Sequence, residues 1–401
     1  MATSAGAFPR ALLRRSNGAR VGYFAAYTIG HANIVQALDA VLRALRQPID
    51  TWTPVILVIG PAGVGKTTLV RAVERELARR LHRELLANPG RLPFVSVVSE
   101  VPESGGFNWK DFCLAGLEAM HEPLVKRKLY LGAPHPGGTA DAAAVSTTRT
   151  PANVMRRALI GALLHRAPGA FLIDEAQQLA MVTGSRKFQH QMDYVKRLAD
   201  ATRVPVVLVG SYGLCLLRNQ SAQLGRRTTD IHFRRYDATR AQDAADFQDI
   251  VLSFQQHLPL AEPPDLSSHW EYLYLRSVGC IGLLKKWLLD ALDQAVGAGA
   301  ATITRADLER TAPPPSKGKK VLEEALDGEA ALAELGPDAD PRAAEAELRA
   351  LLRLPLGSPV ASSTPQTVLP SPAATARQRR PGQRQPARDP VAPADVAALT
   401  G

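Results

Sequence analysis

Short apolar runs separated by longer amphipathic stretches extend over most of the chain. The apolar runs without polar alternation lie at residues 55–59, 93–98, 169–173, 204–209 and 231–233. Runs of this kind are typical of strands covered on both faces, as in a parallel sheet. The stretches between them predict helices at residues 31–46, 67–86, 109–121, 151–165 and 193–201. Strands that alternate with helices predict a doubly wound parallel α/β domain over residues 27–238.

The pattern changes after residue 238. Residues 239–308 favour helices and contain no strong strand pattern, so residues 239–311 are expected to form a small helical lid. The last long helix, at residues 281–296, is followed by Gly297-Ala298-Gly299, which is a natural helix stop.

Both ends of the chain are expected to be disordered. Residues 312–401 hold 14 of the 30 prolines and no aromatic residue, so they cannot bury enough apolar surface to order. This tail is charge-segregated: residues 321–347 carry nine acids and one base, and residues 348–388 carry seven arginines and no acid. The acidic stretch is rich in Ala, Leu and Glu and is compatible with short helices. Residues 1–26 are predicted to be a flexible basic arm, with a targeting peptide as the alternative.

The net charge of +10 belongs to the folded part of the chain. Residues 312–401 carry 11 basic and 11 acidic residues, so residues 1–311 account for the whole excess. A basic folded domain suggests a polyanionic partner such as nucleic acid, whereas solubility alone is the simpler alternative. The three cysteines are far apart and fit a reducing, cytoplasmic location. No apolar run approaches the length of a membrane span.

A complete phosphate-binding loop follows the first apolar run. It reads Gly60-Pro61-Ala62-Gly63-Val64-Gly65-Lys66-Thr67, with Thr68 next, and matches GxxxxGK[ST]. Its glycines let successive backbone N–H groups converge on phosphates, which also lie at the positive end of the following helix. Lys66 is expected to reach the β- and γ-phosphates of ATP, and the Thr67 hydroxyl to coordinate Mg²⁺. The strand before it and the helix after it support an ATP-binding P-loop.

An acidic pair follows a later apolar run, in Phe171-Leu172-Ile173-Asp174-Glu175. With a P-loop upstream, Asp174 is expected to hold Mg²⁺ through water. Glu175 is expected to polarise the water that attacks the γ-phosphate, so the protein is predicted to be a Mg²⁺-dependent ATPase that produces ADP and phosphate.

Further polar residues are candidates for sensing the γ-phosphate. Ser211 ends the run at residues 204–209 and is predicted to orient the attacking water, with an ordinary turn serine as the alternative. Arg226 or Arg227 is predicted to be an arginine finger that acts on a neighbouring subunit's ATP, with a basic surface turn as the alternative. Lys285 in the lid is predicted to contact phosphate, with Lys286 as the second choice and surface lysines as the alternative.

The order of these motifs resembles the AAA+ ATPase superfamily, and within it the TnsC/TniB branch of transposition regulators. Four stretches over about residues 27–310 carry the resemblance. They are Ile29-Gly30-His31, residues 107–112 (FNWKDF), residues 173–179 (IDEAQQL), and residues 210–214 (GSYGL) with residues 231–236 (IHFRRY). By this resemblance His31 would lie near the adenine, with a helix-capping or solvent-exposed histidine as the alternative.

The resemblance implies an ATP-dependent regulator that oligomerises on double-stranded DNA as a ring or helical filament. Such a regulator would link a TniQ-like target-selection protein to the transposase. DNA contacts would be cations on phosphates, and the candidates by position are Lys110, Lys126, Arg127 and Lys128. The alternatives are a replication initiator or loader ATPase, which commonly adds a winged-helix domain, and a protein-remodelling or secretion-associated ATPase that does not act on DNA.

Overall fold

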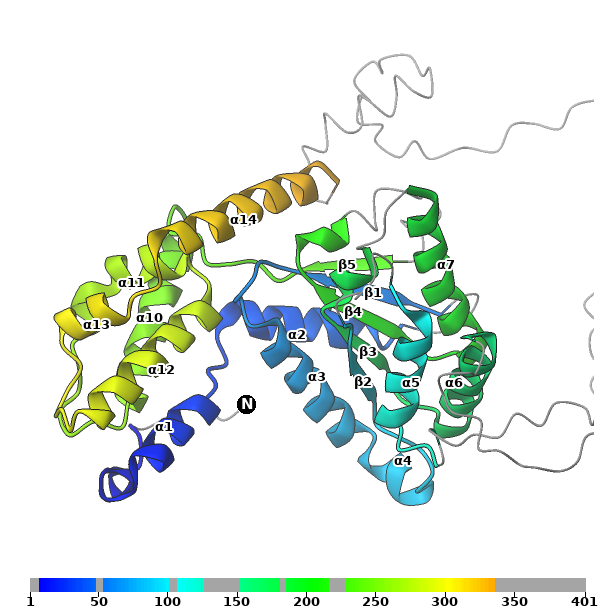
Figure 1. Ribbon diagram of the computed structural model, residues 1–401, viewed down its shortest axis with the longest axis horizontal. Helices are drawn as coiled ribbons and strands as arrows, with labels where there is room; N and C mark the ends of the chain where they lie inside the picture. The colour runs from blue at the N-terminus through cyan, green and yellow to red at the C-terminus, as the bar shows by residue number, and fades with distance from the viewer. Residues whose placement is uncertain are drawn as a thin grey trace, which may run out of the picture. The chain divides into compact units, whose positions relative to one another are not determined.

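One parallel sheet of five strands carries the α/β domain. Its strands are β1 (Val55–Ile59), β2 (Val95–Val98), β3 (Phe171–Asp174), β4 (Val206–Gly210) and β5 (Thr228–His232), in the spatial order β2-β3-β4-β1-β5 (Figure 1). Ile59 of β1 is in register with Gly210 of β4 and His232 of β5. The carboxyl ends of these strands therefore meet at one edge of the sheet, and the predicted parallel α/β fold is confirmed.

The structure is a computed structural model. It describes residues 7–47, 53–100, 107–123, 125, 152–180, 185–215 and 228–335. The chain divides into two units, Met1–Ala339 and Asp340–Gly401, and every described residue belongs to the first.

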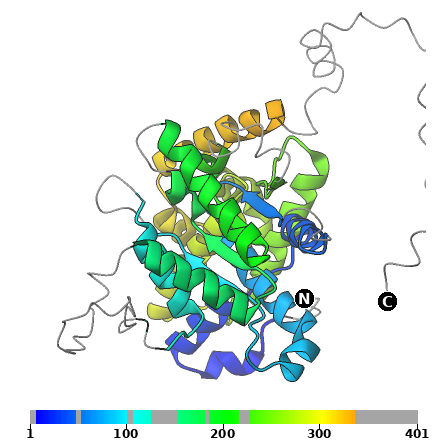
Figure 2. The ribbon, with the colours of Figure 1, turned by 90° about the vertical axis from the view of Figure 1, so that its right-hand side faces the viewer.

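Helices cover both faces of the sheet. One face packs against α2 (Ala32–Ala44) and α3 (Lys66–Arg80) through Ile34, Val41, Leu69 and Val73. The other packs against α5 (Trp109–Ala119), α6 (Ala152–Arg166) and α7 (Ser185–Thr202), and the green helices α6 and α7 lie in front of the sheet in Figure 2. Because both faces are covered, the residues of the inner strands β1, β3 and β4 are all buried, which explains their apolar runs. The edge strands β2 and β5 are only partly buried.

The lid has its own hydrophobic core. It comprises α10 (Ala241–His257), α11 (Trp270–Ser277), α12 (Ile281–Gly297) and α13 (Arg305–Thr311), with a short 3-10 helix, η6 (Ser267–His269). Phe247, Phe254, Leu284 and Trp287 are buried in this core. The helical character predicted for residues 239–311 agrees with the structure.

The N-terminal arm is ordered where the structure describes it, so the prediction of flexibility over residues 1–26 was wrong there. After η1 (Arg10–Arg14), α1 (Asn17–Ala26) packs on α12 of the lid. Phe24 is fully buried in the lid core, and the Arg20 guanidinium donates to the carbonyl of Pro259. The basic composition concealed a short apolar face formed by Val21 and Phe24.

The first part of the tail is also ordered, which corrects the boundary predicted at residue 312. Residues Pro315–Leu335 form α14, which contacts α11 of the lid and the short helix η5 (Tyr212–Leu214) after β4. Ala325 of this helix is fully buried against the core of the α/β domain. An Ala-, Leu- and Glu-rich helix needs few aromatic residues when a neighbouring surface already supplies them. Residues 336–401 lie outside the described part of the chain.

Two smaller features complete the fold. The helix predicted at residues 67–86 is divided at Leu81 into α3 and α4 (His82–Ala87). Among the described residues, none of the helices combines the length and the apolar character that crossing a membrane requires.

Candidate functional site

The loop between β1 and α3 is shaped by its glycines. Gly65 has a φ of 115°, a conformation that favours glycine, and it precedes the first residue of α3. Gly60 lies so close to the chain after β5 that a Cβ atom there would be 2.2 Å from the carbonyl oxygen of Phe233. The loop therefore directs the N-terminus of α3 toward the edge where the strands end, as a P-loop requires.

Lys66 is buried at the start of α3. Its ammonium group donates hydrogen bonds to the carbonyl oxygens of Gly60 (3.0 Å) and Pro61 (2.9 Å). Burial lowers the pKa of Lys66, while the charges of Glu175, Asp174, Cys280 and Glu324, in decreasing order of effect, raise it. The cation is held in the loop itself and faces several acidic groups.

Thr67 and Asp174 meet although they are 107 residues apart. The Thr67 hydroxyl donates to Oδ2 of Asp174 at 3.0 Å, and the backbone N–H of Glu175 donates to the other carboxylate oxygen at 2.9 Å. Hydroxyl and carboxylate oxygens are ligands that Mg²⁺ prefers, and Mg²⁺ commonly keeps several waters and binds substrate phosphates as well. The pair fits a hydrated Mg²⁺ beside the P-loop, and the metal-binding role of these two residues remains a prediction.

Glu175 is held by Gln177 in an uncommon backbone conformation. Its φ of 54° lies in the left-handed region, which is unfavourable for a residue with a Cβ atom. The Gln177 side-chain amide donates to the Glu175 carboxylate, and its oxygen accepts the backbone N–H of Ser211 at 3.0 Å. Gln177 thus connects the acidic pair after β3 to the end of β4.

Ser211 lies at the predicted place, directly after β4. Its hydroxyl accepts a weak hydrogen bond of 3.4 Å from the backbone N–H of Gly213 and so caps the short helix η5. This is the ordinary turn contact that formed the alternative, and the water-orienting role of Ser211 remains a prediction.

The lid touches the P-loop through α12, but through a different residue than expected. The backbone N–H of Leu283 donates to the carbonyl oxygen of Gly63 at 3.2 Å. Lys285 points elsewhere: its ammonium group donates to the carbonyl oxygens of Ala25 (2.7 Å) and Tyr27 (2.6 Å). Burial, and then the nearby charge of Arg71, lower the pKa of Lys285. In this structure Lys285 fastens the N-terminal segment to the lid, and its phosphate-sensing role remains a prediction.

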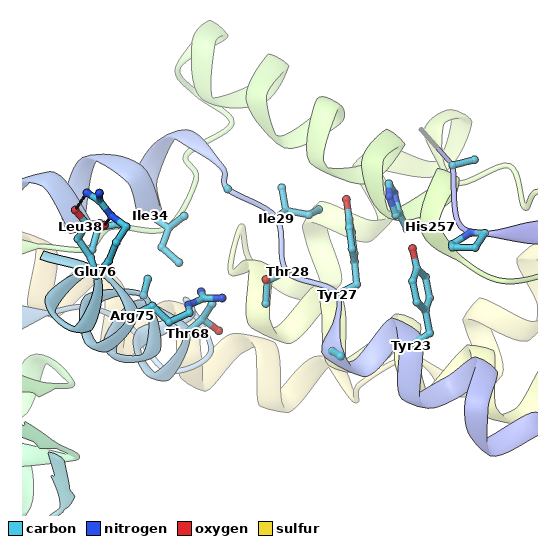
Figure 3. A pocket seen from close by; sticks show the side chains of 16 residues that line it. Tyr23, Tyr27, Thr28, Ile29, Ile34, Leu38, Thr68, Arg75, Glu76 and His257 are labelled. Carbon is cyan, nitrogen blue, oxygen red and sulfur yellow. Dashed lines mark hydrogen bonds and ion pairs between the residues drawn. The ribbon is translucent and has the colours of Figure 1, made fainter. Parts of the chain in front are cut away.

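A cavity of about 820 Å³ opens beside the start of α3. Figure 3 shows Thr68 and Arg75 of α3 on one side, with Tyr27, Ile29 and His257 on the other. This cavity adjoins the P-loop, because Thr68 directly follows Thr67.

His31 is not among the residues that line the cavity, although its neighbour Gly30 is. It caps α2 through Nδ1, which also lies 3.0 Å from the Tyr236 hydroxyl. Burial lowers the pKa of His31 to about 4, so the ring is neutral near pH 7. The helix-capping alternative is therefore observed, while the place of the adenine remains a prediction.

The other predicted residues are less fully placed. Lys110 lies in the first turn of α5, where Asn108 caps the helix. The candidate finger and the candidate DNA-binding run lie outside the described residues: Arg226, Arg227, Lys126, Arg127 and Lys128.

Gln177 and Leu283 are site residues that the sequence did not single out. Gln177 belongs to the stretch IDEAQ, so its position two residues after Glu175 was a usable signal. Leu283 carried no such signal in the sequence, because its contact with Gly63 is made by backbone atoms.

Residues 52–216 match the family model of the AAA domain. With the observed strand order, this match identifies the AAA+ P-loop fold, and it supports a nucleotide-hydrolysing ATPase. No curated protein matches the chain.

Several solved structures are similar at low identity. The ORC2 protein of Aeropyrum pernix is 15% identical over 73% of this chain and 70% of its own, with a TM-score of 0.48. The ORC1 protein of Aeropyrum pernix, solved in complex with DNA, is 16% identical over 74% and 68%, with a TM-score of 0.45. A Walker-type ATPase of Pyrococcus abyssi is 17% identical over 76% and 75%, with a TM-score of 0.42.

Proposed function

We propose that this AAA-domain protein is an ATP-dependent, DNA-binding regulator of transposition. In this proposal it oligomerises on double-stranded DNA and links a target-selection protein of the TniQ type to the transposase. The observation that supports the ATPase part is the contact between Thr67 and Asp174, which joins a P-loop hydroxyl to a strand-end carboxylate. The support for the DNA part is the basic excess of residues 1–311.

The site residues divide the work of hydrolysis in this proposal. Lys66 leaves the loop carbonyls to bind the β- and γ-phosphates. Thr67 and Asp174 would hold Mg²⁺, which would supply positive charge to neutralise the phosphates. Glu175 polarises the attacking water, and Ser211 orients it. Arg226 or Arg227 of a neighbouring subunit stabilises the charge that develops on the γ-phosphate.

The adenosine half of the nucleotide is proposed to enter the cavity beside α3. Its walls offer an aromatic ring, Tyr27, and an aliphatic side chain, Ile29, against which a base can pack. His31 acts here indirectly, since it fixes the start of α2 next to these residues.

Gln177→Ala is expected to lower the turnover number about tenfold while changing ATP affinity less than about twofold. The variant leaves the Glu175 carboxylate without the side-chain donor that orients it, but it removes no group from the phosphate site. Steady-state phosphate release and ATP titration measure the two effects. The control is Gln178→Ala, since the Gln178 side-chain oxygen has no hydrogen-bond partner among the described residues. An unchanged turnover number for Gln177→Ala would show that Glu175 does not depend on this contact.

Two other functions compete with the transposition role. A replication initiator or loader ATPase would share the ATP site and the DNA binding. A protein-remodelling or secretion-associated ATPase would share only the ATP site. Co-sedimentation with duplex DNA, with and without a non-hydrolysable ATP analogue, separates the DNA-binding functions from the protein-remodelling or secretion-associated function. A reconstituted transposition assay with transposase and a TniQ-like protein then separates the two DNA-binding functions.

A chain truncated after Leu335 is expected to keep ATP-dependent, largely sequence-independent DNA binding that weakens steeply with salt. The truncation keeps α14 and removes the basic part of the tail, and cations on phosphates release counterions. In the full chain, Lys126→Ala/Arg127→Ala/Lys128→Ala should flatten the slope of log affinity against log salt by up to about 3.

The matched control carries three alanines in the basic tail, Arg379→Ala/Arg380→Ala/Arg384→Ala, and should leave that slope unchanged. Loss of DNA binding on truncation, or a flattened slope in this control, would place the DNA contact in the tail instead.

A further inference from the structure

The acidic helix α14 joins the lid to the α/β domain. Near its start, Gly318 lies against Val278 and Arg276 at the end of α11. Its second half lies on η5, where Ala325 is fully buried. Figure 1 shows α14 in orange, running from the lid helices toward the edge of the sheet where β4 ends. The helix therefore contacts both parts that hold the candidate nucleotide site.

A buried arginine fixes the second half of α14. Arg235, directly before the lid, is only 7% exposed, and its guanidinium donates to both carboxylate oxygens of Glu329 at 3.0 and 3.2 Å. Two parallel hydrogen bonds between charged groups are among the strongest side-chain contacts. Because Arg235 is contributed by the α/β domain, this pair anchors the acidic helix beside the site.

Shape complementarity adds to this ion pair. Gly328 lies so close to the ring of Tyr212 that a Cβ atom there would be 2.0 Å from Cγ of the ring. The ring has little room to move, because it is buried and its hydroxyl lies 3.0 Å from Nε2 of His232. At this point the helix comes too close to the ring for a Cβ atom, and the next residue, Glu329, carries the carboxylate that pairs with Arg235. Tyr212 directly follows Ser211, so the contact lies just after β4, next to the residue proposed to orient the attacking water.

The helix also brings negative charge toward the phosphate-binding lysine. The carboxylate of Glu324, one residue before the buried Ala325, raises the pKa of Lys66, though less than Glu175, Asp174 and Cys280 do. The phosphates of ATP must approach the same ammonium group. A carboxylate at this place opposes them by like-charge repulsion.

We propose that the surface formed by Tyr212, Arg235 and the end of α11 is a regulatory docking site for an acidic helix. In this chain α14 fills the site, and while docked it lowers the affinity of the P-loop for ATP. ATP binding and helix docking then oppose each other, and each must weaken the other by the same factor. Because α14 leads directly into residues 336–401, the charge-segregated part of the tail follows the docked helix in the chain. This inference rests on the proposed ATP-binding function.

Two glycines of the same helix provide the test. In the full chain, Gly328→Ala forces a Cβ atom into Tyr212, whereas in Gly318→Ala the nearest atom, Cγ2 of Val278, would be 3.6 Å away. Both changes replace a helical glycine by alanine, the stronger helix former, so the clash with Tyr212 is what separates them. Gly328→Ala is expected to speed amide hydrogen exchange in α14 and to tighten the binding of a fluorescent ATP analogue with Mg²⁺ by about fivefold or more. Gly318→Ala should match the wild type in both measurements.

A second pair of variants tests the charge while the helix stays docked. Glu324→Gln is expected to tighten ATP binding, and Glu323→Gln, whose exposed side chain pairs with Lys319, is the control with no effect. In the wild type, ATP should speed exchange in α14.

The proposal is overturned if Gly328→Ala releases α14 without tightening ATP binding. It is equally overturned if α14 remains docked in that variant and Glu324→Gln binds ATP as the wild type does. Failure of the wild-type chain to bind ATP would instead contradict the proposed function itself.

Discussion

Replacing Lys66 by alanine is expected to weaken nucleotide binding by at least about 100-fold, because the loop loses the cation that contacts the β- and γ-phosphates. Each charge-assisted hydrogen bond to such a group contributes about 1.5–3 kcal/mol, and Lys66 can make two. The ammonium group is already buried and held by Gly60 and Pro61, so little ordering is required when phosphate replaces these carbonyls.

Titration with a fluorescent ATP analogue measures the loss. Arg83→Ala, at an exposed position of α4, removes one positive charge away from the loop and should bind as the wild type does. Thermal unfolding of both variants checks that the α/β domain remains folded. Wild-type affinity in Lys66→Ala would exclude the P-loop as the nucleotide site.

Replacing Glu175 by glutamine is expected to lower ATP hydrolysis about 10²- to 10⁴-fold while ATP binding persists. The amide keeps the shape of the side chain, and its oxygen can still accept the hydrogen bond from Gln177, so the strained turn after β3 is retained. What the amide lacks is the negative charge that attracts a proton from water. ATP-bound oligomers should therefore accumulate.

Phosphate release and size-exclusion chromatography with nucleotide analysis test both parts of this expectation. The matched control is Glu271→Gln at an exposed position of α11, which should hydrolyse ATP normally. A wild-type rate in Glu175→Gln would assign the activation of water to another residue.

Several parts of the site follow from short stretches of sequence. The P-loop could be located because glycines at fixed positions impose a backbone path, as the φ of 115° at Gly65 illustrates. The strands could be located because burial on both faces requires unbroken apolar runs. Asp174 and Glu175 follow from the same logic, since a strand that ends in acids places them at one edge of a parallel sheet.

Contacts between distant segments could not be read in this way. The sequence gives the position of Lys285 on α12, but its partners Ala25 and Tyr27 are about 260 residues away. Ala25 belongs to the arm expected to be flexible, and Tyr27 directly follows that arm. The lid contact with the P-loop is made by backbone atoms of Leu283, which carry no residue-specific signal. Gln177 was visible as a residue, but the meeting of its side chain with both Glu175 and Ser211 depends on the packing of β3 beside β4.

The sequence by itself determined the parallel α/β fold, the helical character of the lid and the local path of the P-loop, since apolar periodicity and glycine geometry act within a few residues. Only the tertiary structure decided where the terminal segments belong. Composition marks residues 315–335 as acidic and poor in aromatics, yet α14 is ordered because Tyr212 and Arg235 offer a ring and a buried cation to it. A segment's order depends on the surface it meets as well as on its own apolar content, and that surface is assembled by the rest of the fold.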